Sequence, residues 1–231
     1  MEYCLMIQNM HTNYSLNGDV KTNLHILFCD DFSNMSAFVH CIWLLLSILV
    51  TVTCTYSLVQ PEWFLHPDLI HTFGIYAYCL QDFHYSYPRQ ICGYYGGHFG
   101  ISNVPSKPWK AACLLFGGGC MFMCVSCLFA LISLCTRRGC DTMLVLITTY
   151  LQIAAVVFLT CGILACPLGL NSSFFRFYCG QLASAFYSGS CDMGWAYMLA
   201  IVGTSLSIFC PILSQLVEKR HTKYPLTESS I

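Results

Sequence analysis

The sequence predicts an all-α membrane protein, in which four transmembrane helices carry a small, disulfide-tied extracellular β-sheet. Hydrophobic residues make up 56% of the 231 residues and charged residues only 9%, whereas soluble domains average about 25% charged residues. Every charged residue lies outside four apolar stretches, at residues 37–59, 111–135, 143–166 and 195–217. Each stretch has 23 to 25 residues, which is enough for a helix to cross a hydrocarbon core of roughly 30 Å. These observations exclude an ordinary soluble domain.

The four stretches define one membrane domain over residues 37–217. The two tails and the two long loops cover residues 1–36, 218–231, 60–110 and 167–194. The N-terminal tail contains acidic residues and no long apolar run, so it lacks the core of a cleaved signal peptide. We therefore expect the first helix itself to start membrane insertion. Met35, just before that helix, is a candidate for an alternative start of translation.

Basic residues gather on one side of the predicted membrane domain. Two arginines lie in the short loop before residue 143 and three basic residues follow residue 217, whereas the loop 60–110 has only three and the loop 167–194 only one. Lys and Arg in short flanking segments tend to remain in the cytoplasm. The pattern predicts cytoplasmic termini and extracellular long loops, in a multi-pass protein of the plasma membrane.

Four of the 17 cysteines lie well inside the predicted extracellular loops, at positions 79, 92, 179 and 191. Disulfides form in that oxidising environment. Pairing within each loop, Cys79 with Cys92 and Cys179 with Cys191, closes short segments, whereas pairing across loops needs a particular tertiary approach. We prefer the within-loop pairs. Reduced thiols and other connectivities remain alternatives, because connectivity cannot be deduced from sequence alone.

The first long loop contains two strand candidates, residues 72–80 and 89–95, which are rich in aromatic and β-branched residues. Turn-forming residues, among them Asp82 and Pro88, separate the two. The pattern predicts a hairpin tied by a disulfide, in which Gly74 permits close packing.

Residues of this loop resemble the signature of the claudin superfamily. The matching positions here are Trp63, Gly74, Ile75, Tyr76, Cys79 and Cys92. Two further runs, residues 105–112 around Trp109 and residues 191–197 around Trp195, are similar to the LHFPL tetraspan family. Isoleucine and tyrosine stand where claudins usually carry leucine and tryptophan, so the paracellular function of claudins is not carried over.

The resemblance implies a left-handed four-helix bundle capped by an extracellular sheet, in a family without known catalytic activity. Better-understood members act as auxiliary subunits of channels, receptors or adhesion proteins. We therefore expect the lipid bilayer and a heterologous membrane protein as partners. The alternative is a claudin-like protein that self-associates into junctional strands or pores, but the loop charges are too sparse and mixed to suggest a selectivity patch.

Other functional classes find little support in the sequence. The sequence shows no recognisable set of catalytic residues and no cofactor-binding motif. It also has no large basic cluster of the kind that binds nucleic acid. The first long loop contains four histidines whose spacings of five, thirteen and fourteen match no compact zinc motif. We interpret them as ordinary surface histidines and expect no metal site at His66, His71, His84 and His98.

Inside the predicted helices, small residues recur at steps of three or four. Such residues let membrane helices approach closely, and we assign them to packing within the bundle, with docking of a partner as the alternative. They are Cys113, Gly117, Cys120, Cys124 and Cys127 in the second stretch, and Ala196, Ala200, Gly203, Ser207, Cys210 and Ser214 in the fourth. For Gln152 in the third stretch we expect interhelical hydrogen bonds.

Three candidate modification or recognition sites complete the prediction. Cys135 and Cys140 flank two arginines at the expected cytoplasmic edge and are candidates for S-palmitoylation. Ser229 and Ile231 place a hydroxyl two residues before a terminal apolar side chain, the arrangement that class I PDZ domains bind. Asn171 begins a glycosylation sequon that lies close to the membrane.

Overall fold

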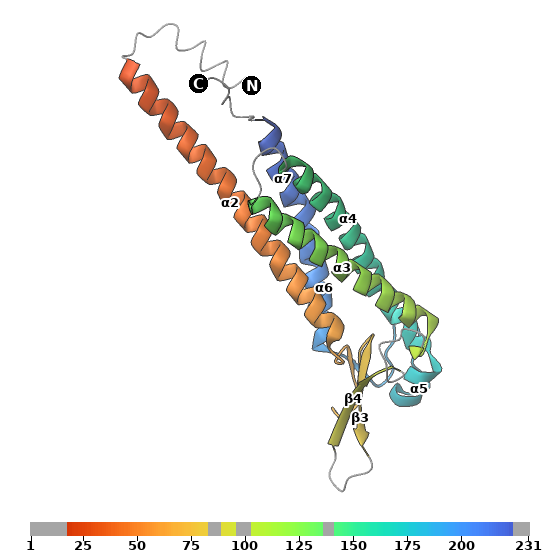
Figure 1. Ribbon diagram of the computed structural model, residues 1–231. Helices are drawn as coiled ribbons and strands as arrows, with labels where there is room; N and C mark the ends of the chain where they lie inside the picture. Colours follow the sequence, from red (N-terminus) through yellow and green to blue (C-terminus); the bar gives the residue numbers. More distant parts are fainter. Residues whose placement is uncertain (1–17, 83–88, 96–102, 136–140, 224–231) are drawn as a thin grey trace.

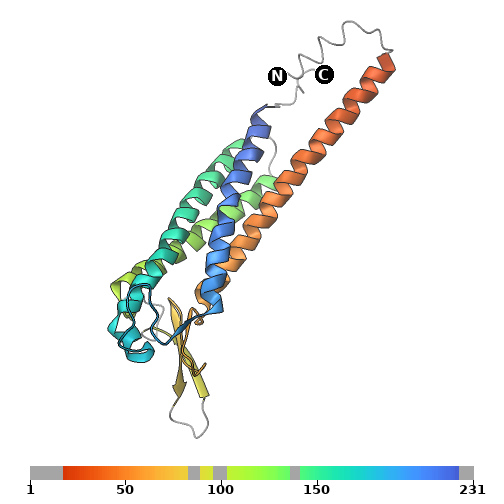
Figure 2. The same ribbon diagram turned by 180° about the vertical axis from the view of Figure 1, so that it is seen from behind.

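The computed structural model describes residues 18–82, 89–95, 103–135 and 141–223, and the side chains of residues 38–81, 90–95, 103–133 and 143–218. The helices form an elongated bundle, and a small sheet lies at one end of it together with α5 (Figures 1 and 2). Four segments are long and apolar enough to cross a membrane: Phe38–Val59, Lys107–Ser133, Met143–Asn171 and Trp195–Glu218. The predicted fold class is confirmed.

The first helix, α2, covers Gly18–Val59 and is much longer than the apolar stretch that predicted it. Its N-terminal part projects beyond the other helices, at the end of the bundle opposite the sheet (Figures 1 and 2). Residues 18–36 were expected to form part of a tail. Hydropathy locates the part of a helix that can lie in lipid. The helix itself can extend further, because its backbone hydrogen bonds continue wherever the sequence tolerates them, so α2 begins before the apolar stretch does.

The second and third membrane helices, α3 (Lys107–Cys135) and α4 (Asp141–Ala165), pack against each other more extensively than any other pair of elements. The start of α3 precedes the expected residue 111, because Ser106 caps it: its hydroxyl accepts a hydrogen bond from the Trp109 backbone N–H at 3.3 Å. A short 3₁₀ helix, η3 (Cys166–Asn171), continues α4, and α5 (Ser173–Cys179) follows.

The fourth span is interrupted at Ile208, which separates it into two helices, α6 (Trp195–Ser207) and α7 (Phe209–Lys223). Pro211 explains the interruption. Proline has no N–H to bond the carbonyl four residues earlier, and its ring clashes with that carbonyl. The carbonyl in question belongs to Ser207, the last residue of α6.

The sheet has five antiparallel strands in the order β4-β3-β2-β1-β5. They are β1 (Phe64–Leu65), β2 (Thr72–Phe73), β3 (Ala77–Asp82), β4 (Arg89–Tyr94) and β5 (Asp192–Met193). The expected hairpin corresponds to β3 and β4. The expected strand 72–80 is split, because the chain turns at Gly74, whose N–H donates to the Ala77 carbonyl at 2.8 Å.

Most of the small residues of the second and fourth spans are buried inside the bundle, and Gly117 and Cys124 are partly buried. Cys113, Cys120 and Cys127 are buried in α3, and all six positions named above for the fourth span are buried as well. This burial agrees with the packing interpretation. A Cβ atom at Gly162 of α4 would come 2.7 Å from the Phe116 backbone N in α3, so the two helices approach as closely as glycine allows.

Gln152 is fully buried and joins two helices through its amide. Its Oε1 accepts a hydrogen bond from Trp43 Nε1 at 3.2 Å, and its Nε2 donates to Ser47 Oγ at 3.0 Å. A second polar contact, from Thr149 Oγ1 to Ser214 Oγ at 2.9 Å, joins α4 to α7. Gln152 therefore makes the interhelical hydrogen bonds that its position in the third stretch predicted.

Candidate functional site

The described segments that connect the spans at the sheet end of the bundle form what we call the loop layer, residues 60–82, 89–95, 103–106 and 172–194. Both connections contribute strands to one sheet: β1 pairs with β5, which places Phe64 opposite Met193. A backbone hydrogen bond from the Gly194 N–H to the Trp63 carbonyl, at 2.7 Å, extends this connection toward α6. The loop layer is thus one folded unit.

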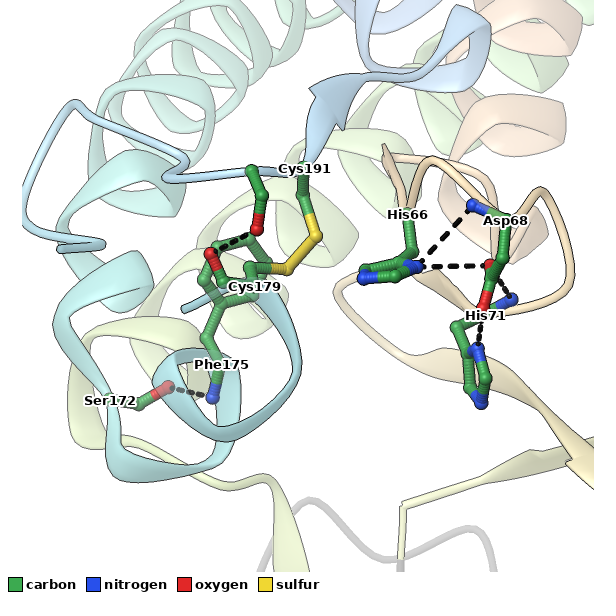
Figure 3. Close-up of a disulfide and its surroundings, with 8 residues drawn as sticks. His66, Asp68, His71, Ser172, Phe175, Cys179 and Cys191 are labelled. Carbon is green, nitrogen blue, oxygen red and sulfur yellow. Dashed lines mark hydrogen bonds and ion pairs between the residues drawn. A yellow bond between two sulfur atoms is a disulfide. The ribbon is translucent and has the colours of Figure 1, made fainter. Parts of the chain in front are cut away.

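Two disulfides tie the loop layer, and both follow the preferred pairing. Cys79 joins Cys92 between directly opposed positions of β3 and β4. Cys179, the last residue of α5, joins Cys191 just before β5 (Figure 3). Ser190 reinforces the second bond, because its backbone N–H and its hydroxyl both donate to the Cys179 carbonyl, at 2.9 and 2.7 Å. The cross-loop alternatives are excluded by this geometry.

The predicted signature residue Trp63 fixes the loop layer to the helices. Its side chain is fully buried, and its Nε1 donates to the Ser57 carbonyl of α2 at 2.8 Å. The ring lies edge-on to Phe116 of α3 and against Tyr197 of α6, with ring centroids 5.4 Å apart in both pairs. One side chain therefore contacts three membrane helices at the point where the sheet begins.

The signature residues Gly74, Ile75 and Tyr76 form the tight connection between β2 and β3. A Cβ atom at Gly74 would meet the Gln60 carbonyl at 2.6 Å, so this position requires glycine. Ile75 is fully buried, and Tyr76 packs against Tyr94 with ring centroids 5.0 Å apart. These residues thus have a structural role in packing the sheet on the bundle.

Tyr95, which the sequence did not single out, anchors the same turn. Its hydroxyl donates to the Gly74 carbonyl at 3.0 Å, in a buried position. Burial, followed by the effects of neighbouring thiols and Tyr78, raises the pKa of the Tyr95 hydroxyl well above its ordinary value. The hydroxyl therefore remains protonated and acts as a permanent hydrogen-bond donor.

The two remaining signature tryptophans have different surroundings. Trp109 is fully buried near the start of α3, where its ring is edge-on to Phe175 of α5 at a centroid distance of 5.9 Å. Trp195 begins α6 and is partly exposed, with its Nε1 donating to the Glu62 carboxylate. An exposed tryptophan with a polar partner at the end of a membrane span is typical of the membrane–water interface.

Large apolar side chains are exposed in the segment 172–194. Leu182, Phe177 and Phe186 are 82%, 77% and 68% exposed, and Tyr187 is also exposed. We call these four residues the apolar loop surface. Exposed apolar groups along the spans face lipid, whereas these four lie outside the spans. Exposed apolar patches often mark interaction sites, which makes these four residues the candidate contact of the loop layer.

A cluster of His66, Asp68 and His71 lies at the turn between β1 and β2 (Figure 3). His66 Nδ1 lies 3.1 Å from Asp68 Oδ1, and His71 Nδ1 contacts Asp68 Oδ2. The sequence prediction interpreted these histidines as ordinary surface residues, because their spacing along the chain matches no compact zinc motif. The register of the β1–β2 hairpin brings them together: Leu65 pairs with Thr72, so the following pair of opposed residues is His66 and His71.

The carboxylate of Asp68 is held by backbone donors. Its Oδ1 accepts hydrogen bonds from the N–H groups of Ile70 at 3.0 Å and His71 at 3.1 Å. Partial burial raises the pKa of Asp68, but the hydrogen bonds from His71, Ile70 and His66 outweigh that effect and hold its pKa well below the ordinary value. Asp68 is therefore an anionic group of fixed orientation.

The predicted modification and recognition residues are mostly beyond the described part of the chain. Cys140, Ser229 and Ile231 lie outside it, and Cys135 is described only as the last backbone position of α3. Asn171 is exposed at the end of η3, where its Oδ1 accepts a hydrogen bond from Arg176 at 2.5 Å. No reaction chemistry is indicated by the residues that are described.

Comparison with known proteins agrees with this architecture. Residues 39–219 match the family described as lipoma HMGIC fusion partner-like protein. The chain belongs to the LHFPL tetraspan family. It is therefore a multi-pass membrane protein in contact with the lipid bilayer, and the match covers all but the first residue of the four spans and the whole loop layer between them.

Individual LHFPL relatives match over most of the membrane domain. The member 7 protein of Xenopus tropicalis is 32% identical over 180 residues, which cover 75% of this chain and 88% of that protein. The member 2a protein of Danio rerio is 30% identical over 64% of each chain. The human member 2 protein is 27% identical over 77% of this chain and 86% of its own length. From the sequence, the run at residues 178–187 predicts a relation closest to the second member of the family, and member 2 proteins are represented among these matches.

Proposed function

We propose that this LHFPL protein is a non-enzymatic accessory subunit that binds a heterologous membrane protein through the apolar loop surface. The observation that carries the proposal is the apolar loop surface, which is exposed outside the spans. Its residues belong to a segment that a disulfide and a shared sheet hold in place. A rigid segment loses little conformational freedom on binding, which favours association.

We further propose that the loop layer faces the extracellular side of the plasma membrane and that both termini are cytoplasmic. The distribution of Lys and Arg along the sequence supports this orientation. The two disulfides support it as well, because such bonds persist in an oxidising compartment. In this orientation a partner meets the apolar loop surface with its own extracellular part.

Burial of the apolar loop surface supplies a measurable share of binding free energy. Fully burying a leucine or phenylalanine side chain contributes about 1.5–3 kcal/mol. Because Leu182 and Phe177 are 82% and 77% exposed, most of that contribution is available to a partner. Exchange of both residues for serine should therefore weaken partner binding by roughly 2–4 kcal/mol, or about 30-fold to 1,000-fold.

Affinity purification in mild detergent, followed by quantitative mass spectrometry, tests the proposal. A heterologous membrane protein should be recovered with the wild type and lost with the Phe177→Ser, Leu182→Ser double variant. The matched control is Ile91→Ser, the same kind of exchange at an exposed apolar residue of β4. Surface biotinylation checks that all variants reach the cell surface. Recovery of this chain alone would instead support self-association into junctional assemblies.

We also propose, from the sequence, a PDZ-binding motif and a lipid modification on the cytoplasmic side. The tail ending in Ser229 and Ile231 binds a PDZ domain by adding as a strand, with its carboxylate held by backbone N–H groups. Cys135 and Cys140 carry palmitoyl groups at the membrane edge. Acyl exchange on a variant with serine at both cysteines tests the palmitoylation, because labelling equal to that of the wild type would contradict it.

A further inference from the structure

We propose that His66, Asp68 and His71 form a binding site for Zn²⁺ at the turn between β1 and β2. One ligand atom from each of the three residues can be chosen so that all three lie within 4.8 Å of one another. Two imidazole nitrogens and one carboxylate oxygen are donors that zinc commonly takes in proteins. Ca²⁺ and Mg²⁺ prefer sites made of oxygen ligands, so the donor set favours zinc.

The hairpin brings the two histidines together. The β1–β2 register pairs Leu65 with Thr72, and the next opposed positions are His66 and His71. Their backbones are joined by a hydrogen bond from the His66 N–H to the His71 carbonyl, at 3.0 Å. Directly opposed residues place their side chains on the same face of a hairpin. The imidazole centroids are accordingly 5.8 Å apart.

Asp68 supplies the third donor from within the turn. The backbone N–H groups of Ile70 and His71 hold its Oδ1, and both ring Nδ1 atoms face the same carboxylate. In Figure 3 the side chains of His66 and His71 both lie against Asp68. The turn itself is closed by a hydrogen bond from the Leu69 N–H to the His66 carbonyl at 2.9 Å. The carboxylate is thus positioned before any ion binds.

A zinc ion fits this cluster after a small adjustment. Zinc–ligand bonds of about 2.0–2.2 Å place neighbouring tetrahedral ligands about 3.4 Å apart. The ligand atoms lie within 4.8 Å of one another, and His66 Nδ1 lies 3.1 Å from Asp68 Oδ1, so rotation of the partly exposed side chains adjusts their separations. The side chains of His66, Asp68 and His71 are 30%, 33% and 16% exposed, which lets the ion enter and leaves a fourth position for water.

Chemical footprinting of the wild-type protein tests the proposal without a variant. The full-length protein in detergent is treated with a chelator, its accessible free thiols are alkylated so that they do not bind metal, and Zn²⁺ is added before diethyl pyrocarbonate. Mass spectrometry should show at least fivefold protection of His66 and His71, with one shared midpoint in zinc concentration. His84 and His98, the other histidines of the same loop, should not be protected. Absence of protection, or equal protection of all four, would overturn the proposal.

A matched pair of variants gives a second test by isothermal titration with Zn²⁺. Asp68→Asn keeps a side-chain oxygen for the Ile70 and His71 N–H groups but removes the anionic donor, so it should preserve the turn and lower zinc affinity at least tenfold. His84→Ala should leave the affinity unchanged. Wild-type affinity in Asp68→Asn, or loss of binding in His84→Ala, would show that the ion binds elsewhere. If Asp68→Asn fails to fold, the wild-type footprint decides the question.

Discussion

Replacement of Gly162 by alanine should separate the two most closely packed helices. A Cβ atom at this position of α4 would lie 2.7 Å from both Cβ and N of Phe116 and 2.9 Å from its Cα. Two of these three atoms belong to the backbone of α3, so rotation of a side chain does not relieve the contact. Gly119 of α3 makes the reciprocal approach, since its Cβ would meet Leu159 Cγ at 2.7 Å.

The size of the effect follows from these distances. Carbon atoms in favourable contact are about 3.5–4.0 Å apart, so α3 and α4 must move apart by roughly 1 Å. Overpacking of this kind costs about 1–3 kcal/mol in well-packed interiors. Alanine also improves helix propensity over glycine, by about 1 kcal/mol in water. A matched control is needed to separate the two effects.

Gly117→Ala provides that control in the neighbouring helix. Its nearest contact would be Leu58 Cδ2 at 3.8 Å, an ordinary van der Waals distance. The variant should therefore be as stable as the wild type or slightly more stable. Because Gly117→Ala and Gly162→Ala share the gain in propensity, the difference between them measures the clash, about 1–3 kcal/mol.

Unfolding in mild detergent with increasing SDS measures this difference. A thiol-reactive fluorophore reports opening of the bundle, because Cys120, Cys166 and Cys210 are free and buried in the folded state. Gly162→Ala should react at lower SDS than the wild type, and Gly117→Ala should not. Equal stability of the two variants would refute the argument, since it would show that α3 and α4 separate without cost.

Three further predictions concern the bundle, the sheet and the tail. Gln152→Leu removes both interhelical hydrogen bonds of Gln152, so the SDS titration should show a loss of about 1–2 kcal/mol; wild-type stability would mean that these bonds add nothing. Serine at both Cys79 and Cys92 should destabilise the sheet by about 2–4 kcal/mol and reduce delivery to the cell surface, measured by biotinylation, whereas unchanged delivery would argue against a structural role. A peptide of the last ten residues should bind members of a PDZ-domain array, and Ile231→Ala should abolish the signal; equal signals from both peptides, or none from either, would exclude this recognition.

The spans and the hairpin could be predicted because their signals are local. A helix in lipid must be apolar along its whole length, so the absence of charge alone located the four spans. Cysteines separated by short segments suggested the pairs Cys79–Cys92 and Cys179–Cys191, which the structure contains. The interruption at Ile208 also had a local signal, Pro211, whose effect four residues earlier was not considered.

The remaining features depend on contacts between distant parts of the chain. Strands β1 and β5 have two residues each, too few to show an alternating pattern, and their pairing joins Phe64 to Met193 although two membrane helices separate them in the chain. The cluster of His66, Asp68 and His71 was missed for a related reason. A spacing of five residues matches no helical zinc motif, but it places two histidines opposite each other once a hairpin register is known.

The distribution of polar groups indicates where a partner can gain the most from binding. The four predicted spans contain no Asp, Glu, Lys or Arg, and buried groups such as Gln152 and Thr149 bond to neighbouring helices. Apolar side chains on the outside of the spans already contact lipid, which is as apolar as they are, so a partner that covers them removes no water. Phe177 and Leu182 are different, because they lie outside the spans and their apolar side chains are largely exposed. The hydrophobic contribution to binding should therefore come from the loop layer, and this is why serine at these two positions, rather than substitutions on the membrane face, is the sharper test of partner binding.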